Sequence, residues 1–333
     1  MKIGEFYRNA VAAGIAADLR GMKEIEGLLA EAAKEFKETK DAEKKYFDQD
    51  RLFNPYADSR LLCGDPEADV RRILVGIDID GGELHLAHTL NKDAAGPKIG
   101  LVLGHHPMGP ALYQMFDVMH IQARLLALHG VTIGVAEQLM DRRIDEVERR
   151  LLPANATRTT DLARALDLPL MCLHTAADNC VTKYLTDLFA VEKPAKLKDL
   201  VKLLRDIPEY EKSIRLQAPP KIISGKDSGS CGRIFVDMTG GTEGAKDIFD
   251  RLASGGVSTI VGMHMSEEHL TSAKRAGLNV VIAGHIASDV LGLNLLLDQV
   301  EKDKRLDYVC LSGFERFRRG FSSAGNSGSY SRP

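Results

Sequence analysis

One pattern that occurs twice constrains the fold of this chain more than any other sequence feature. In each half, a short apolar run leads to a Gly-Gly pair, and about twenty residues later a second apolar run ends at a glycine closely followed by histidine. The first copy contains Gly81-Gly82 and Gly104-His105, and the second contains Gly240-Gly241 and Gly262-Met263-His264. Self-similarity of this kind indicates an internal duplication. The sequence therefore predicts two similar α/β lobes.

Short apolar runs alternate with helical patterns through both halves, which is typical of α/β units with mixed or largely parallel sheets. We expect strands at 72–77, 99–103, 131–135, 168–173, 233–236, 258–261 and 279–282, and helices near 111–129, 138–150, 159–166, 195–205, 243–254 and 266–276. The apolar stretch 278–297 carries His285 and Asp289. Because an ionisable pair inside a membrane is costly, this stretch indicates a buried strand followed by a helix.

The length of 333 residues suggests about two domains. Residues 1–66 are predicted to form an N-terminal helical extension, because their first fifty residues combine apolar residues at helical spacing with alternating charge. The first α/β lobe is expected at 67–191, a connecting segment at 192–231 and the second lobe at 232–320. The Ser/Gly-rich tail 321–333 is expected to be disordered.

Charge and cysteine content narrow the class of protein. The net charge of −3 does not fit a dedicated nucleic-acid binder, although Arg316, Arg318 and Arg319 offer a local basic patch. Residues 1–20 lack the apolar core of a secretory signal. The five cysteines form no Cys-x-x-Cys pair, which favours reduced thiols and a cytoplasmic protein without a membrane span.

Three groups of polar residues each follow a predicted strand directly. They are Gly104-His105-His106-Pro107, the segment from His174 to Asp178, and the segment from His285 to Asp289. Ligands of open α/β sheets bind at the carboxyl ends of strands. Adjacent histidines at a strand end point in different directions and can serve two neighbouring ions, whereas residues four apart on a helix share one face.

These residue types are suited to a metal site. A single histidine at a strand end is commonly a polar loop residue, and a His–Asp pair four residues apart is commonly a local ion pair. Three such groups together favour metal binding. Two ions about 3.5–4 Å apart need several imidazoles and a bridging carboxylate, and this donor set suits zinc, iron or manganese.

In these motifs the chain resembles the Nif-three-like family, also described as GTP cyclohydrolase I type 2 homologues. The likeness extends to Gly262-Met263-His264-Met265-Ser266-Glu267 and the following helix. The resemblance implies two lobes that face a central metal cleft and a homo-oligomer such as a hexameric ring. It also implies two divalent ions bound by the residues His105, His106, Asp178, His285 and Asp289. His174 would then orient Asp178 from outside the ligand shell.

The chain departs from the family pattern in three respects. The family usually has glutamate at the position of Asp289, and aspartate is one methylene shorter. The segment between His106 and His174 is longer than in compact members. The N-terminal extension is an addition. These differences indicate a divergent relative.

Two functional hypotheses follow. The first is a dinuclear metal-dependent hydrolase that acts on a nucleotide-like or small phosphorylated substrate through a metal-activated water. His264 or Glu267 would carry protons, and Glu268 is a further candidate. The alternative is a non-catalytic metal-binding scaffold or protein-interaction module, with the N-terminal helix as its docking arm. An open coordination position on the metal would favour catalysis over a structural role.

Overall fold

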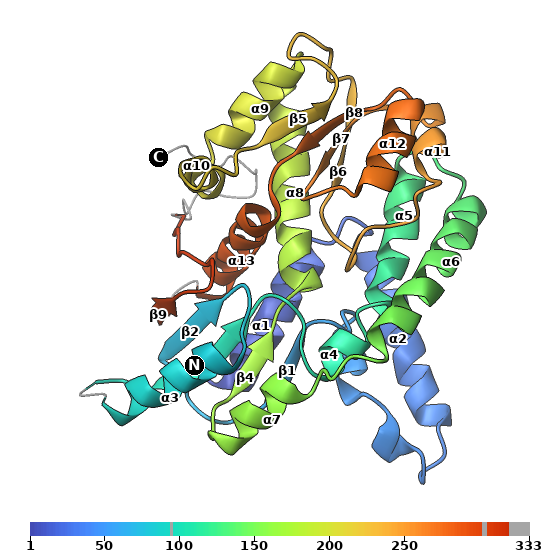
Figure 1. The fold of residues 1–333 in the computed structure, drawn as a ribbon. Coiled ribbons are helices and arrows are strands. Elements are labelled where there is room, and N and C mark those ends of the chain that lie inside the picture. The colour runs from blue at the N-terminus through green and yellow to red at the C-terminus, as the bar shows by residue number, and fades with distance from the viewer. Residues whose placement is uncertain (94–95, 302–304, 320–333) are drawn as a thin grey trace.

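The computed structural model describes residues 1–93, 96–301 and 305–319. The predicted disordered tail at 321–333 lies outside these ranges. Two separate sheets organise the described chain, with helices packed around and between them (Figure 1). None of the helices in these ranges combines the length and the apolar character that crossing a membrane requires.

The first sheet has five strands in the order β1-β4-β3-β2-β9. Strands β2 (Arg72–Gly76), β3 (Ile99–Gly104), β4 (Leu170–Cys172) and β9 (Asp307–Cys310) run parallel, and β1 (Arg60–Cys63) pairs antiparallel with β4. Residues of β2, β3 and β4 are buried almost continuously, as expected for parallel strands covered on both faces.

The second sheet repeats this arrangement in the order β5-β8-β7-β6. Strands β6 (Arg233–Asp237), β7 (Val257–Gly262) and β8 (Asn279–Ile282) run parallel, and β5 (Lys221–Ser224) pairs antiparallel with β8. The register shifts after the first residue of β2 and, in the same way, after the first residue of β6. The shared strand order supports the predicted duplication.

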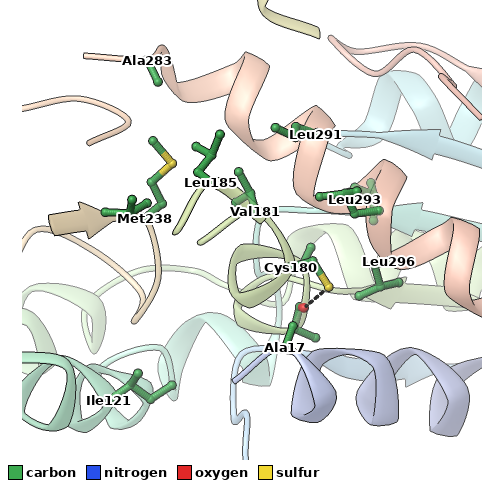
Figure 2. Packing of buried hydrophobic residues seen from close by; sticks show 14 of the residues in the cluster. Ala17, Ile121, Cys180, Val181, Leu185, Met238, Ala283, Leu291, Leu293 and Leu296 are labelled. Atoms are coloured by element: carbon green, nitrogen blue, oxygen red, sulfur yellow. Dashed lines mark hydrogen bonds between the residues drawn. The ribbon is translucent and has the colours of Figure 1, made fainter. Parts of the chain in front are cut away.

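Two helices begin immediately after the equivalent strands β4 and β8. Helix α8 (Thr175–Glu192) follows β4, and α13 (His285–Glu301) follows β8. The two helices pack against each other in the interior, and α1 (Ile3–Ala16) packs against both. Figure 2 shows Val181 and Leu185 of α8 in the same apolar cluster as Leu291 and Leu296 of α13. One core therefore joins the two halves through these helices.

The N-terminal segment divides into two helices with different environments. Helix α1 is largely buried, whereas α2 (Met22–Glu38) buries only Ile25 and Ala32. The chain breaks between them at Gly21, whose φ of 85° favours glycine. Strand β1 lies within the predicted extension and β9 within the predicted second lobe, yet both belong to the first sheet. The first sheet thus combines strands from three of the predicted segments.

Several helices differ from the sequence prediction. The predicted strand at 131–135 is wrong, because α6 (Ile133–Leu151) begins there. Its buried residues Ala136, Met140, Ile144 and Val147 recur at helical spacing. The predicted helix at 111–129 is divided into α4 (Pro110–Tyr113), a 3-10 turn (Asp117–Met119) and α5 (His120–Leu128). The helix predicted from 243 begins only at α11 (Phe249–Ser254).

The remaining helices lie close to their predicted positions or in segments left unassigned. They are α3 (Gly81–Lys92), α7 (Arg158–Ala165), α9 (Leu197–Arg205), α10 (Pro208–Arg215) and α12 (Glu267–Arg275), with short 3-10 turns at Lys44–Tyr46 and Gln49–Leu52. All five cysteines are free thiols, as predicted, and Cys172 and Cys180 are buried.

Candidate metal centre

The carboxyl ends of β3, β4 and β8 bring together the residues predicted as metal ligands. His105 and His106 follow β3, Asp178 lies in the first turn of α8, and His285 begins α13. Asp289 lies one turn further along α13, next to these residues. Since β3 and β4 belong to the first sheet and β8 to the second, both lobes contribute to the cluster.

Asp289 occupies the middle of this cluster. Its Oδ1 lies 3.5 Å from His105 Nε2, and its Oδ2 lies 3.4 Å from His106 Nε2 and 3.6 Å from His285 Nε2. The side chain is only 1% exposed. The two oxygens of one carboxylate thus face different histidines, as a bridging ligand requires. Aspartate reaches both sides here despite being shorter than glutamate.

The fully buried His105 faces two carboxylates. Its Nδ1 lies 2.9 Å from the carbonyl oxygen of Leu173, which fixes the tautomer with hydrogen on Nδ1. The opposite nitrogen, Nε2, lies 3.4 Å from Asp178 Oδ1 as well as near Asp289. An imidazole held in this way presents the lone pair that a metal needs.

Two further histidines are each held by a carboxylate on Nδ1. His106 Nδ1 lies 2.7 Å from Asp78 Oδ1, and His174 Nδ1 lies 2.8 Å from Asp58 Oδ2. His174 Nε2 lies 3.7 Å from Asp178 Oδ2. Ring nitrogens of His105, His106 and His174 lie within 4.8 Å of one another. His174 therefore lies in one group of candidate ligand atoms with His105 and His106.

Asp58 is a functional candidate that the sequence prediction missed. It is fully buried and also accepts a hydrogen bond from the Thr175 hydroxyl at 2.7 Å. Asp58 lies in the segment predicted as a helical extension, and 116 residues separate it from His174. No local pattern in the sequence marks this pairing.

The buried side-chain atoms of this cluster that lack a hydrogen-bond partner show whether it fits a cation. Four buried side-chain atoms of this cluster have no hydrogen-bond partner among the described residues: His105 Nε2, Asp178 Oδ1, Asp289 Oδ1 and Asp289 Oδ2. Burying such groups without a partner is costly, and native proteins rarely leave them so. Because these four atoms face one another, one or more bound cations would satisfy them. The residues present therefore fit a metal site.

The electrostatics agree with this fit. Burial alone lowers the pKa of His105, but Asp289 and Asp178 outweigh it and hold that pKa well above its usual value. Burial alone raises the pKa of Asp289, yet the neighbouring histidines hold that pKa well below its usual range. Burial lowers the pKa of His285, which favours its neutral, metal-binding form. The cluster thus attracts positive charge to its centre.

His264 lies beside this cluster, whereas Glu267 does not. The His264 ring centroid lies 4.9 Å from that of His285, and its Nδ1 lies 3.6 Å from Glu243 Oε1. Glu243 raises the pKa of His264 against the lowering effect of burial. His264 follows Gly262 by two residues, as His106 follows Gly104, so it is the second-lobe counterpart of His106. Glu267 instead begins α12 and lines a surface cavity with Lys246 and Arg275.

Comparisons with known proteins bear on the fold. No protein-family model and no curated protein matches the chain. A NIF3 superfamily protein from Sphaerobacter thermophilus has a similar structure, with a TM-score of 0.67 and 24% identity over 86% of this chain and 97% of that one.

Two other solved structures are more distant. Reduced HcgD from Methanocaldococcus jannaschii has a TM-score of 0.46 at 13% identity, covering 75% of this chain and 87% of that one. TTHA1606 from Thermus thermophilus has a TM-score of 0.43 at 13% identity, covering 80% and 91%. We assign the fold from the similarity to the Sphaerobacter protein. The chain therefore has a NIF3-like fold, which confirms, at the level of the fold, the resemblance that its histidine motifs indicate.

Proposed function

We propose that this chain is a dinuclear metal-dependent hydrolase. The observation that carries the proposal is the position of Asp289, whose two buried and unsatisfied oxygens face His105 on one side and His106 and His285 on the other. A site for a single ion would need only one of these oxygens. A carboxylate placed between two sets of imidazoles is the arrangement expected for two ions.

The ligands divide into two sets around Asp289. His105 and Asp178 would hold one ion, and His106 and His285 the other. We also propose His174 as a ligand of the cluster instead of a residue that only orients Asp178. Its support is the pairing with Asp58, which presents Nε2 of His174 as Asp78 presents Nε2 of His106. Zinc, iron and manganese suit this donor set.

The proposed chemistry assigns separate tasks to the ions and to the chain. Two bound ions would supply a water of lowered pKa and stabilise developing negative charge. Asp58, Asp78 and the Leu173 carbonyl orient the imidazoles. His264, half-exposed and held by Glu243, is the group we propose to transfer protons to or from a substrate. Glu267 remains a weaker candidate for that role, because it lies away from the cluster.

The substrate class and the assembly rest on the family resemblance. We propose a nucleotide-like or small phosphorylated substrate bound in a central cleft between the lobes, and a homo-oligomer such as a hexameric ring. The alternative, a non-catalytic metal-binding scaffold, is supported by the exposed helix α2, which offers a docking arm.

Metal analysis of the purified chain tests the proposal. We expect about two equivalents of divalent metal per chain, and much less after Asp289→Asn, which keeps the shape of the side chain but removes its charge. Asp187→Asn on the exposed face of α8 is the matched control and should retain the metal. One equivalent or none in the wild type, or full metal in Asp289→Asn, would refute the dinuclear site.

Turnover distinguishes the enzyme from the scaffold. A panel of phosphoesters and nucleotides should give metal-dependent hydrolysis that is lost in Asp289→Asn and reduced in His264→Ala with its metal retained. Two tightly bound ions with no open coordination position and no turnover would favour the scaffold.

A further inference from the structure

A cavity lined by arginines lies along the edge strand β9 of the first sheet, and Arg72 on its wall lies at the opposite end of β2 from the candidate metal centre. It has a volume of about 400 Å³, and its wall includes Arg72, Arg305, Tyr308, Arg316 and Arg318. Arg72 is the first residue of β2. Ile77, which directly follows β2, lies beside the histidines, because its carbonyl accepts hydrogen bonds from the backbone of His105 and His106. Five strand residues span roughly 16 Å. The cavity is therefore separate from the metal centre.

The inner wall of this cavity is rigidly built. The Arg316 side chain is 4% exposed, and its guanidinium contacts Asp298 at 2.5 Å and Glu301 at 2.7 Å. Arg318 also pairs with Glu301, at 3.2 Å. Both guanidinium groups lie over the ring of Tyr308, with centroid distances of 5.6 and 5.4 Å. These contacts hold two arginines in fixed positions at low entropic cost.

Arg316 retains a hydrogen-bond donor that none of the described residues accepts. Its Nε is buried and has no hydrogen-bond partner among the described residues. Arg319, the third member of the basic patch seen in the sequence, turns instead to Glu209 at 2.5 Å. Of the three arginines of the basic patch, Arg319 therefore pairs with Glu209, whereas Arg316 and Arg318 line the cavity.

The charge of the wall favours an anion. Asp307 is the acidic residue among those that line the cavity, which also include Pro97, Leu306 and Cys310. Asp307 and the partners Asp298 and Glu301 carry three negative charges against the four arginines, which leaves one positive charge on the described wall. Arg72 and Arg305 supply guanidinium groups beyond those paired with Asp298 and Glu301. Guanidinium groups match phosphate oxygens in geometry and charge.

We propose that this cavity binds a small phosphate-bearing anion. The site is independent of the proposed hydrolase activity. Pyrophosphate is a suitable probe, because it carries phosphate groups without a base or sugar that other surfaces might recognise.

Calorimetric titration of the full chain with pyrophosphate tests this site. Metal is first removed by chelation and the chelator is then removed by buffer exchange, so that the anion cannot coordinate a metal ion. We expect saturable binding to the wild type that weakens about tenfold or more in the double variant Arg72→Gln/Arg305→Gln. Arg205→Gln, an exposed arginine at the end of α9, is the matched control and should bind as the wild type does.

Neither Arg72 nor Arg305 forms a buried ion pair with a described residue, so we expect the double variant to fold. Circular dichroism checks that it does. Unchanged affinity in the double variant, or no binding to the wild type, would overturn the proposal. Equal weakening by Arg205→Gln would also overturn it, because the attraction would then be a general effect of surface charge. Loss of binding in Asp289→Asn with the four arginines intact would assign the anion to the metal centre instead.

Discussion

At the residue scale, the candidate metal centre has carboxylates that hydrogen-bond the Nδ1 atoms of two of its histidines. Asp58 is the most deeply buried of these. Burial raises its pKa, but the hydrogen bonds from His174 and Thr175 outweigh burial and hold that pKa below its usual value, so the carboxylate stays ionised. Asp78 has the same relation to His106 but is 72% exposed. The two carboxylates thus offer a comparison of one interaction in two environments.

Replacing Asp58 should weaken metal binding more than replacing Asp78. We expect Asp58→Ala to lower metal affinity by about 10–100-fold, because His174 loses the group that fixes its ring. Asp78→Ala should have a smaller effect, since water can replace an exposed carboxylate. Competition with a coloured chelator measures both affinities. Equal affinities for Asp58→Ala and the wild type would show that Asp58 has no part in metal binding.

Asp237 makes stability depend on pH in the second lobe. Burial raises its pKa to about 6, against the lowering effects of His269 and His264. In the unfolded chain the pKa is about 3.9. The folded form therefore binds the proton more tightly, so the stabilisation is complete below about pH 4 and is lost as the pH rises through 6.

Asp237→Asn should remove this dependence. At pH 8 the variant should be more stable than the wild type by about 3 kcal/mol, at roughly 1.4 kcal/mol per unit of pKa shift, because no charge is then buried. At pH 4 the two should be alike. Urea unfolding at both pH values measures the difference, and a variant that is less stable at pH 8 would contradict the assignment.

At the element scale, the distance between α8 and α13 sets the distance between Asp178 and Asp289. The helices approach closely at Gly292, where an added Cβ would lie 2.5 Å from the Ala177 carbonyl oxygen. That contact is far shorter than van der Waals distance and involves backbone, which cannot rotate away. Glycine is therefore required where the two helices that carry the candidate ligands Asp178 and Asp289 cross.

Gly292→Ala should separate the two helices and reduce both stability and metal content. Overpacking of this kind typically costs about 1–3 kcal/mol. Gly27→Ala on the exposed helix α2 is the control, since nothing lies within 4 Å of its Cβ position, and it should be neutral or stabilising. Chemical unfolding and metal analysis of both variants test the pair. Full metal content in Gly292→Ala would show that the crossing does not control the site.

At the scale of the whole molecule, bound metal would join the two lobes, because each lobe contributes ligands to one cluster. A ligand that binds only the folded state stabilises it by about 4 kcal/mol at 1,000 times its dissociation constant. Chelation should therefore lower the thermal unfolding temperature of the wild type, and added zinc or manganese should restore it. Asp289→Asn should show no such response. A wild type unaffected by chelation would exclude a metal that links the lobes.

The sequence by itself determined the features that depend on local pattern. The parallel strands that end at Gly104 and Gly262, and the strand before His285, are marked by apolar runs and glycines, so they were predicted within one or two residues. The repeated pattern also predicted the duplication. The positions of three polar groups at strand ends predicted a metal site, and the family resemblance selected His105, His106, Asp178, His285 and Asp289 as its ligands. Strands β1, β5 and β9 were missed, because short edge strands bury fewer residues and show little alternation.

Only the tertiary structure decided which groups support the cluster. Asp58 reaches His174, and Glu243 reaches His264, through contacts between segments that are distant or irregular in sequence. How whole elements pack also decides that His174 lies near the candidate ligand atoms, that Asp289 faces histidines on both sides and that the basic patch is divided. Hydrophobic periodicity reports which face of an element is buried, but it does not report what that face meets. For that physical reason the candidate ligands can be predicted from the sequence, whereas their hydrogen-bond partners and the distances between them cannot.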